Sequence, residues 1–130
     1  MTRQQLEHII RASGAITNLD TIVVVGSQAI LGAVPSAPAD LLKSMEADVY
    51  PLDKPDYSDL IDGAIGEGSQ FHETFEYYAH GVGPETAVLP LGWETRATGI
   101  CNANTNSITG ICPSPLDFSR PGRRGRDLPQ

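Results

Sequence analysis

A run of five strand-forming residues, 21–25, is the feature that most constrains the fold of this chain. Its sequence, Thr-Ile-Val-Val-Val, is typical of a buried strand, and Gly26 and Ser27 end it. A second extended segment, 46–50, follows a loop that contains two prolines. Helical patterns lie around these segments. The chain is therefore expected to be a small α/β protein with a mixed sheet flanked by helices.

The expected order is helix, strand, helix, strand, helix and then strands. Thr2 and Gln5 fit a capping box for the first helix, which is expected to end near Gly14. Three apolar residues at helical spacing give this helix a core-facing stripe: Leu6, Ile9 and Ile10.

Asp56 is expected to cap the helix that lies between the second and third strands. Its inward-facing residues are predicted to be Leu60, Ile61, Ala64 and Ile65. Residues 77–82 and 86–89 are predicted strands, and a weak strand is expected over 98–101. We expect His72 to lie in a surface loop and Trp93 to serve in packing.

Two acids, Glu46 and Asp48, stand one residue apart in the second extended segment. Because side chains alternate along a strand, both acids and Tyr50 should face one side, while Ala47 and Val49 face the other. Two converging carboxylates repel each other unless a cation lies between them. Mg²⁺ takes oxygen ligands and keeps room for substrate phosphates, so the pair is a candidate catalytic metal site.

Gly26 and Ser27 could hold a phosphate next to these acids. A glycine at the end of a strand lets the backbone approach a phosphate, and the Ser27 hydroxyl can donate to it. A helix starting near Gln28 would add further donors. The hypothesis requires that 46–50 pairs beside 21–25, with the acids at the same end of the sheet as Ser27.

Other interpretations remain open from spacing alone. Glu46 and Asp48 could be the solvated face of an edge strand, where charges discourage pairing with other chains. The turn at Gly26 could be an ordinary end of a buried strand. A dinucleotide-binding loop is a poorer match, because residues 26–32 lack the Gly-x-Gly-x-x-Gly start.

The order of apolar strand, Gly-Ser, short helix and acid-apolar-acid strand resembles the nucleotidyltransferase superfamily of the DNA polymerase beta type. Residues 26–32, 44–48 and 78–90 also resemble a bacterial nucleotidyltransferase-like family related to AbiEii-type toxins. This resemblance covers most of the chain up to about Thr109. It implies a domain that binds a nucleoside triphosphate with Mg²⁺ and, if active, transfers a nucleoside monophosphate to an RNA or protein hydroxyl.

In the superfamily a third acid follows on a later strand of the same sheet. The nearby residues here are Glu76, His80 and Glu85, and none matches the expected apolar-acid-apolar arrangement. The alternative is therefore a catalytically inactive nucleotide-binding or interaction protein of a toxin-antitoxin-type system. A cognate antitoxin-like protein would then be its partner.

Length and composition fit one ordinary globular domain: the chain has 130 residues, 40% hydrophobic and 19% charged. No apolar stretch approaches the ~20 residues of a membrane helix, and the first residues lack the apolar core of a signal peptide. We therefore expect a cytoplasmic protein that does not enter a membrane. Cys101 and Cys112 lack zinc-site spacing and are expected to be reduced, buried thiols.

Charge divides the chain unevenly. Residues 1–119 carry five Lys or Arg and fifteen Asp or Glu, while residues 120–130 carry four Arg and one Asp. The acidic body argues against broad nonspecific binding of duplex nucleic acid. Recurrent prolines after Gly110 predict a Pro/Arg-rich disordered tail over 113–130. In the family, this position opens a helical region, so the tail resembles a shortened remnant. The packed domain, which the resemblance implies to be nucleotidyltransferase-like, is then expected over 1–112.

Overall fold

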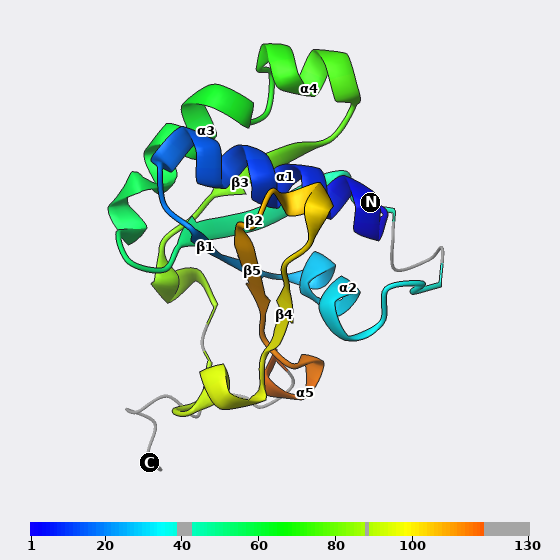
Figure 1. Ribbon diagram of the computed structural model, residues 1–130, viewed down its shortest axis with the longest axis vertical. Coiled ribbons are helices and arrows are strands. Elements are labelled where there is room, and N and C mark those ends of the chain that lie inside the picture. Colours follow the sequence, from blue (N-terminus) through cyan, green and yellow to red (C-terminus); the bar gives the residue numbers. More distant parts are fainter. Residues whose placement is uncertain (39–42, 88, 119–130) are drawn as a thin grey trace.

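The computed structural model describes residues 1–38, 43–87 and 89–118 (Figure 1). The helices are α1 (Arg3–Thr17), α2 (Ile30–Ala33), α3 (Ser58–Ile65), α4 (Gln70–Phe75) and α5 (Pro115–Phe118). The strands are β1 (Thr21–Val25), β2 (Glu46–Pro51), β3 (Tyr78–Gly81), β4 (Thr98–Ile100) and β5 (Thr109–Cys112). Short 3-10 turns are η1 (Ser27–Ala29), η3 (Pro55–Tyr57), η4 (Pro84–Thr86), η5 (Trp93–Arg96) and η6 (Ala103–Thr105).

The described strands form one mixed five-stranded sheet in the order β3-β2-β1-β5-β4. The central strand β1 is antiparallel to β2 and parallel to β5. At the two edges, β3 is parallel to β2, and β4 is antiparallel to β5. The predicted mixed α/β class is therefore confirmed.

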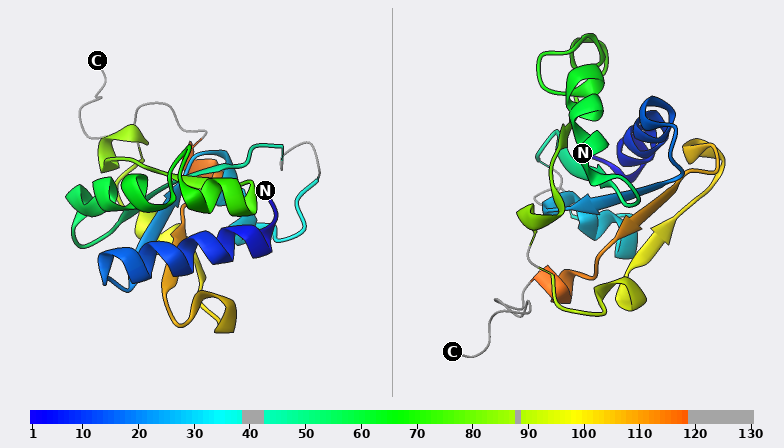
Figure 2. Two further views of the ribbon diagram at one scale, coloured as in Figure 1. Left: turned by 90° about the horizontal axis from the view of Figure 1, so that it is seen from above. Right: turned by 90° about the vertical axis from the view of Figure 1, so that its left-hand side faces the viewer.

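Helices α1 and α3 cover one face of the sheet, as the two views of Figure 2 show. The main core lies beneath them. Alternate strand residues, among them Ile22, Val24 and Val49, meet the α1 stripe there. The predicted stripe is confirmed, because Leu6, Ile9 and Ile10 are fully buried.

The capping box of α1 is also confirmed: the Thr2 hydroxyl accepts from the Gln5 amide, and the Gln5 side chain accepts from the Thr2 amide. The predicted end at Gly14 is wrong, because α1 continues to Thr17. A Cβ on Gly14 would lie 2.6 Å from Ile108 Cδ1. Gly14 therefore permits close packing inside the helix and does not end it.

The other face of the sheet carries a smaller apolar cluster of Val23, Val25, Tyr50 and Val82. Trp93 packs against this cluster, as predicted. Beyond the cluster, at the end of β1, the same face bears polar side chains.

Several local predictions need correction. Pro55–Tyr57 forms η3 before α3, so Asp56 provides no side-chain cap. Of the expected inward residues, Ile61 and Ile65 are buried, whereas Leu60 and Ala64 are exposed.

The region around residue 72 is helical rather than a loop. Ser69 caps α4 by accepting from the His72 amide, a Ser-x-x signal that explains the helix start. The strand predicted over 86–89 is replaced by η4 and irregular backbone in the described part of that segment. The strands predicted over 77–82 and 98–101 are confirmed as β3 and β4.

The structure has two packed elements, β5 and α5, in a region where the sequence predicted little packed structure. In β5, Gly110 pairs with Ile22, and a Cβ there would lie 2.4 Å from Ile10 Cδ1, so glycine lets the strand approach α1. In α5, Asp117 is fully buried and accepts from Arg96. Residues 113–118 thus pack against the body, contrary to expectation. The rest of the predicted tail lies outside the described residues.

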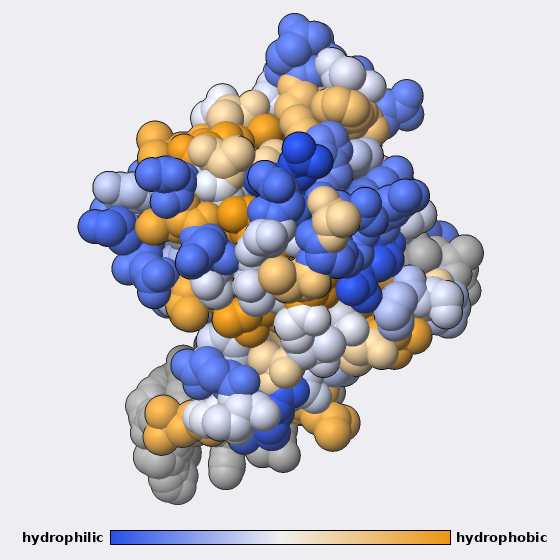
Figure 3. All heavy atoms as spheres, viewed as in Figure 1, coloured by the Kyte–Doolittle hydropathy of each residue, from blue (hydrophilic) through white to orange (hydrophobic). Residues whose placement is uncertain are grey.

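On the face shown in Figure 3, hydrophobic groups are interspersed with hydrophilic ones, and hydrophilic side chains gather over the start of α1. Among the described residues, every helix is too short or too polar to cross a bilayer.

Candidate metal site at the end of the central strands

The register of three strands brings the predicted acids together with one histidine. Val25, the last residue of β1, pairs with Asp48 in β2, and Asp48 pairs with His80 in β3. The predicted pairing of the acidic strand beside 21–25 is therefore confirmed. Ala47 lies in the main core, so the predicted alternation of faces is confirmed too.

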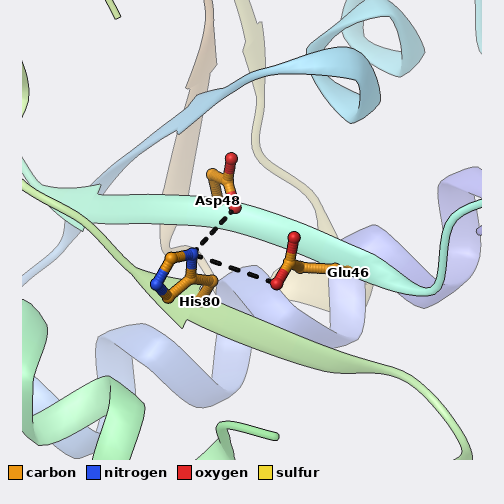
Figure 4. Close-up of side chains that lie close together, drawn as sticks. All are labelled: Glu46, Asp48 and His80. Carbon is orange, nitrogen blue, oxygen red and sulfur yellow. Dashed lines mark ion pairs between the residues drawn. The ribbon is translucent and has the colours of Figure 1, made fainter. Parts of the chain in front are cut away.

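The side chains of Glu46, Asp48 and His80 point toward one another from the two strands (Figure 4). One ligand atom from each residue lies within 4.8 Å of the other two. His80 Nδ1 is 3.4 Å from Asp48 Oδ1 and 3.9 Å from Glu46 Oε2. These are ion-pair distances when the ring is protonated. The three side chains are 39%, 28% and 52% exposed, so the cluster is open to solvent from one side.

Asp48 is the electrostatically strained member of the cluster. Burial raises the pKa of its carboxyl, the nearby Glu46 carboxylate raises that pKa further, and His80 partly offsets both effects. Asp48 Oδ1 is shielded from water and has no hydrogen-bond partner. A buried acceptor without a donor is costly, and a cation bound to it would remove that cost.

The Gly26 turn lies directly against this carboxylate. The Gly26 φ angle is +78°, which favours glycine, and a Cβ there would lie 3.2 Å from Asp48 Oδ2. The backbone can approach Asp48 closely because no side chain intervenes. Even a methyl group on Gly26 would fit only tightly between the turn and the acid.

Ser27 begins the 3-10 turn η1 and is exposed, and its hydroxyl accepts a hydrogen bond from Gln28 Nε2 at 3.2 Å. The helix expected after it is short: η1 has three residues and α2 has four. Any anion bound here would therefore rely on the turn and the Ser27 hydroxyl. Four residues are too few for a helix dipole to contribute much.

Of the three residues considered for the missing third acid, only His80 joins the cluster. Glu76 ends α4 in a left-handed conformation, and Glu85 lies in η4; both are exposed. Within the described residues, Glu46, Asp48 and His80 form the one group of three such ligands placed closely enough for a metal. Two carboxylates and an imidazole replace the expected three carboxylates.

Sequence reasoning missed Tyr78, which pairs with Glu46 and lies two residues before His80 in β3. Burial, followed by the charge of Glu46, raises the pKa of the Tyr78 phenol. The His72 ring lies 4.5 Å from the Tyr78 ring. The alternating pattern Tyr78-x-His80 could have signalled this face, but only with the register of β3 against β2 in hand.

The remaining histidine and the thiols lie away from the cluster. His8 Nδ1 is 2.6 Å from the Tyr77 hydroxyl on the helix-covered side. Cys101 is exposed, contrary to expectation, whereas Cys112 is buried. Burial raises the pKa of Cys112 to about 12, so this thiol is unreactive at neutral pH.

The donor set partly fits the magnesium implied by the resemblance. Two carboxylates are suitable Mg²⁺ ligands, and the Asp48 oxygen without a hydrogen bond suits a bound cation. The backbone at Gly26, which has no side chain, would let an anionic ligand of that cation approach the acid. The imidazole nitrogen is a softer donor than Mg²⁺ prefers. Comparisons with protein-family models, curated proteins and solved structures found no match to this chain, so neither a family nor an activity is established by similarity.

Proposed function

We propose that this chain binds a nucleoside triphosphate through a divalent cation, which the sequence resemblance implies to be Mg²⁺. Glu46 and Asp48 hold the cation, and Gly26 and Ser27 hold phosphate. The observation that carries the proposal is the contact between the Gly26 turn and Asp48: a Cβ on Gly26 would lie only 3.2 Å from Asp48 Oδ2. A phosphate on the turn would thus be next to a cation on the acids.

The proposed reaction is nucleotidyl transfer to a hydroxyl of RNA or protein. The acceptor oxygen bonds to the α-phosphorus, the bond to the leaving oxygen breaks, and pyrophosphate departs with that electron pair. The hydroxyl proton passes to a carboxylate of the site. The divalent cation, when bound, neutralises phosphate charge and helps align the groups for in-line displacement. The turn at Gly26 and Ser27 orients the phosphates.

The order of elements supports this proposal. A buried strand, a Gly-Ser turn, a short helix and an adjacent strand with an acid-x-acid pattern occur in the sequence of the resembled superfamily and lie together in this fold. The same resemblance suggests a bacterial protein with an antitoxin-like partner, and the sequence itself predicts a cytoplasmic one. These points remain predictions.

A second candidate is a catalytically inactive nucleotide-binding or interaction protein of a toxin-antitoxin-type system. One observation favours it: the β3 position opposite Asp48 is His80, where a third carboxylate would complete the superfamily's catalytic set. Binding and turnover should therefore be tested separately.

Binding is tested by calorimetric titration of the full chain with a nucleoside triphosphate, with and without Mg²⁺. Metal-dependent binding is expected for the wild type and should be lost in Asp48→Asn. The matched control is Asp53→Asn, because Asp53 is exposed just beyond the opposite end of β2. Equal binding by the wild type and Asp48→Asn would rule out Asp48 as a ligand.

Turnover is tested with a nucleoside triphosphate labelled at the α-phosphate, incubated with cellular RNA and protein. Magnesium-dependent labelling that is lost in Glu46→Gln would establish the transferase. Metal-dependent binding without any labelled acceptor would instead support the inactive alternative.

A further inference from the structure

We propose that His80 is a third ligand of the bound cation and that the site consequently prefers Mn²⁺ to Mg²⁺. The choice of site rests on the proposed function, but the identity of the ion is argued from the side chains themselves. The two parts can fail separately.

The position of the His80 ring is the first argument. Nδ1 faces both acids, at 3.4 Å from Asp48 Oδ1 and 3.9 Å from Glu46 Oε2. Two ligand atoms bound to one ion can be separated by up to about twice a metal–ligand bond of ~2.1 Å. Both distances fall within that limit. His80 Nδ1 can therefore share one ion with either acid, and one ligand atom from each of the three side chains lies within 4.8 Å of the other two.

The second argument is the environment of the Asp48 carboxylate. Asp48 Oδ1 is buried and has no hydrogen-bond donor, although the Asp48 side chain as a whole is 28% exposed. The unsatisfied oxygen is the one nearest to His80 Nδ1. An ion between these two atoms would satisfy the oxygen and separate the negative charges of Glu46 and Asp48.

The choice of ion follows from the donor chemistry. Mg²⁺ requires oxygen ligands in near-ideal octahedral geometry and rarely accepts imidazole. Mn²⁺ also binds carboxylates and phosphate oxygens, and as a first-row transition ion it accepts imidazole nitrogen. It can thus use all three side chains and keep positions open for phosphate. A set of two carboxylates and one imidazole therefore favours Mn²⁺ over Mg²⁺.

The fold supplies two informative variants and a control. His80→Ala removes the nitrogen ligand, and His80→Asp replaces it with oxygen. His80 is half exposed on an edge strand, so both changes should be tolerated. His72→Ala is the matched control, because His72 contacts the neighbouring Tyr78 ring and lies outside the ligand group.

The experiment is a titration of the full chain with Mn²⁺, followed by the paramagnetic resonance signal of the free ion, with Mg²⁺ as competitor. The wild type should bind Mn²⁺ at least about tenfold more tightly than Mg²⁺. His80→Ala should weaken Mn²⁺ binding about tenfold or more with little effect on Mg²⁺. His80→Asp should retain a metal and lose most of the preference, and His72→Ala should match the wild type.

The position of the ion is tested by nuclear magnetic resonance. Substoichiometric Mn²⁺ should broaden the amide signals of residues 46–48 and 80 first, and this localised broadening should weaken in His80→Ala. Equal affinity of the wild type for both ions, or equal Mn²⁺ binding by the wild type and His80→Ala, would overturn the inference.

The failure of the inference can be distinguished from that of the proposed function. In one outcome, metal-dependent nucleotide binding is lost in Asp48→Asn, but His80→Ala leaves the metal preference unchanged. This outcome would reject His80 as a ligand and leave the proposed function standing. A His80-dependent Mn²⁺ site without nucleotide binding would support the inference and reject the proposed function. Absence of any metal binding would reject both and leave the cluster as an ion pair.

Discussion

Gly26 and Asp48 fit closely together at the end of β1: a Cβ on residue 26 would lie 3.2 Å from Asp48 Oδ2. The turn and the acid come from different strands, and the pairing of Val25 with Asp48 holds them at this separation. A ligand that contacts the turn is therefore adjacent to whatever the acid binds. This relationship underlies the proposed nucleotide site.

Gly26→Ala should reduce both stability and ligand binding. Alanine is unfavourable at φ +78° and ψ −164° by about 1–3 kcal/mol, because essentially only glycine adopts this backbone region, and the added methyl group would press on Asp48. We expect urea denaturation to show a loss of about that size and calorimetry to show loss of metal-dependent nucleotide binding.

Gly68→Ala is the control for backbone strain alone. Gly68 has a φ of +83°, and a Cβ there would meet nothing within 4 Å. Its positive φ should also cost stability, and nucleotide binding should remain unchanged. If both alanine variants bind nucleotide as well as the wild type, the Gly26 turn is not part of the site.

Glu7 should make stability depend on pH. The residue is 5% exposed, and its carboxylate accepts from Asn102 and Asn104, each at 2.8 Å, and from Arg3 at 3.0 Å. Burial works against its charge, but the hydrogen bonds from Asn102, Asn104 and Arg3 outweigh it, so the pKa of Glu7 lies below its ordinary value of 4.5. The folded state thus binds this proton less readily than the unfolded chain.

The stabilisation from Glu7 is therefore fully present above pH 4.5 and is lost as pH falls through the lowered pKa. Glu7→Gln should cost about 1–3 kcal/mol at pH 7, and the difference from the wild type should shrink in acid. Urea denaturation at several pH values measures this, with the exposed Glu73→Gln as control. A cost that stays constant down to pH 3 would contradict the assignment.

Removing Arg96 and removing Asp117 from their ion pair should lower the free energy of unfolding by different amounts. Asp117 is fully buried and accepts from Arg96 Nε at 3.0 and 3.2 Å, whereas the Arg96 side chain is 37% exposed. Arg96→Ala strands a buried carboxylate and should cost about 3 kcal/mol. Asp117→Asn leaves the arginine partly in water and should cost about 1 kcal/mol. Equal small losses in urea denaturation would mean that α5 contributes little to the fold.

The pairing of β1 with β2 was predictable because each strand carries its own signal. Residues 22–25 are continuously apolar, as in a central strand, and 46–50 alternate between the two faces of the sheet. The capping box of α1 was equally readable, since it depends only on residues three apart. Local chemistry was sufficient for these elements and for placing Glu46 and Asp48 on one face of their strand. Their role as ligands stays a prediction.

Elements held by distant partners could not be predicted in this way. The strand β5 contains Gly110, which looks like a turn residue until its contact with Ile10 is known. Helix α5 depends on Arg96, which lies 21 residues before Asp117 in the chain. The position of His80 beside the two acids depends on the register of β3 against β2, which only the assembled sheet fixes.

A crystal structure of the chain with Mn²⁺ and a non-hydrolysable nucleoside triphosphate tests the central claim most directly. Anomalous scattering should locate an ion about 2.1 Å from oxygens of Glu46 and Asp48, with triphosphate oxygens on the same ion and against the turn at Gly26 and Ser27. An ion bound elsewhere, or a triphosphate that leaves the Gly26 turn without contact, would contradict the account.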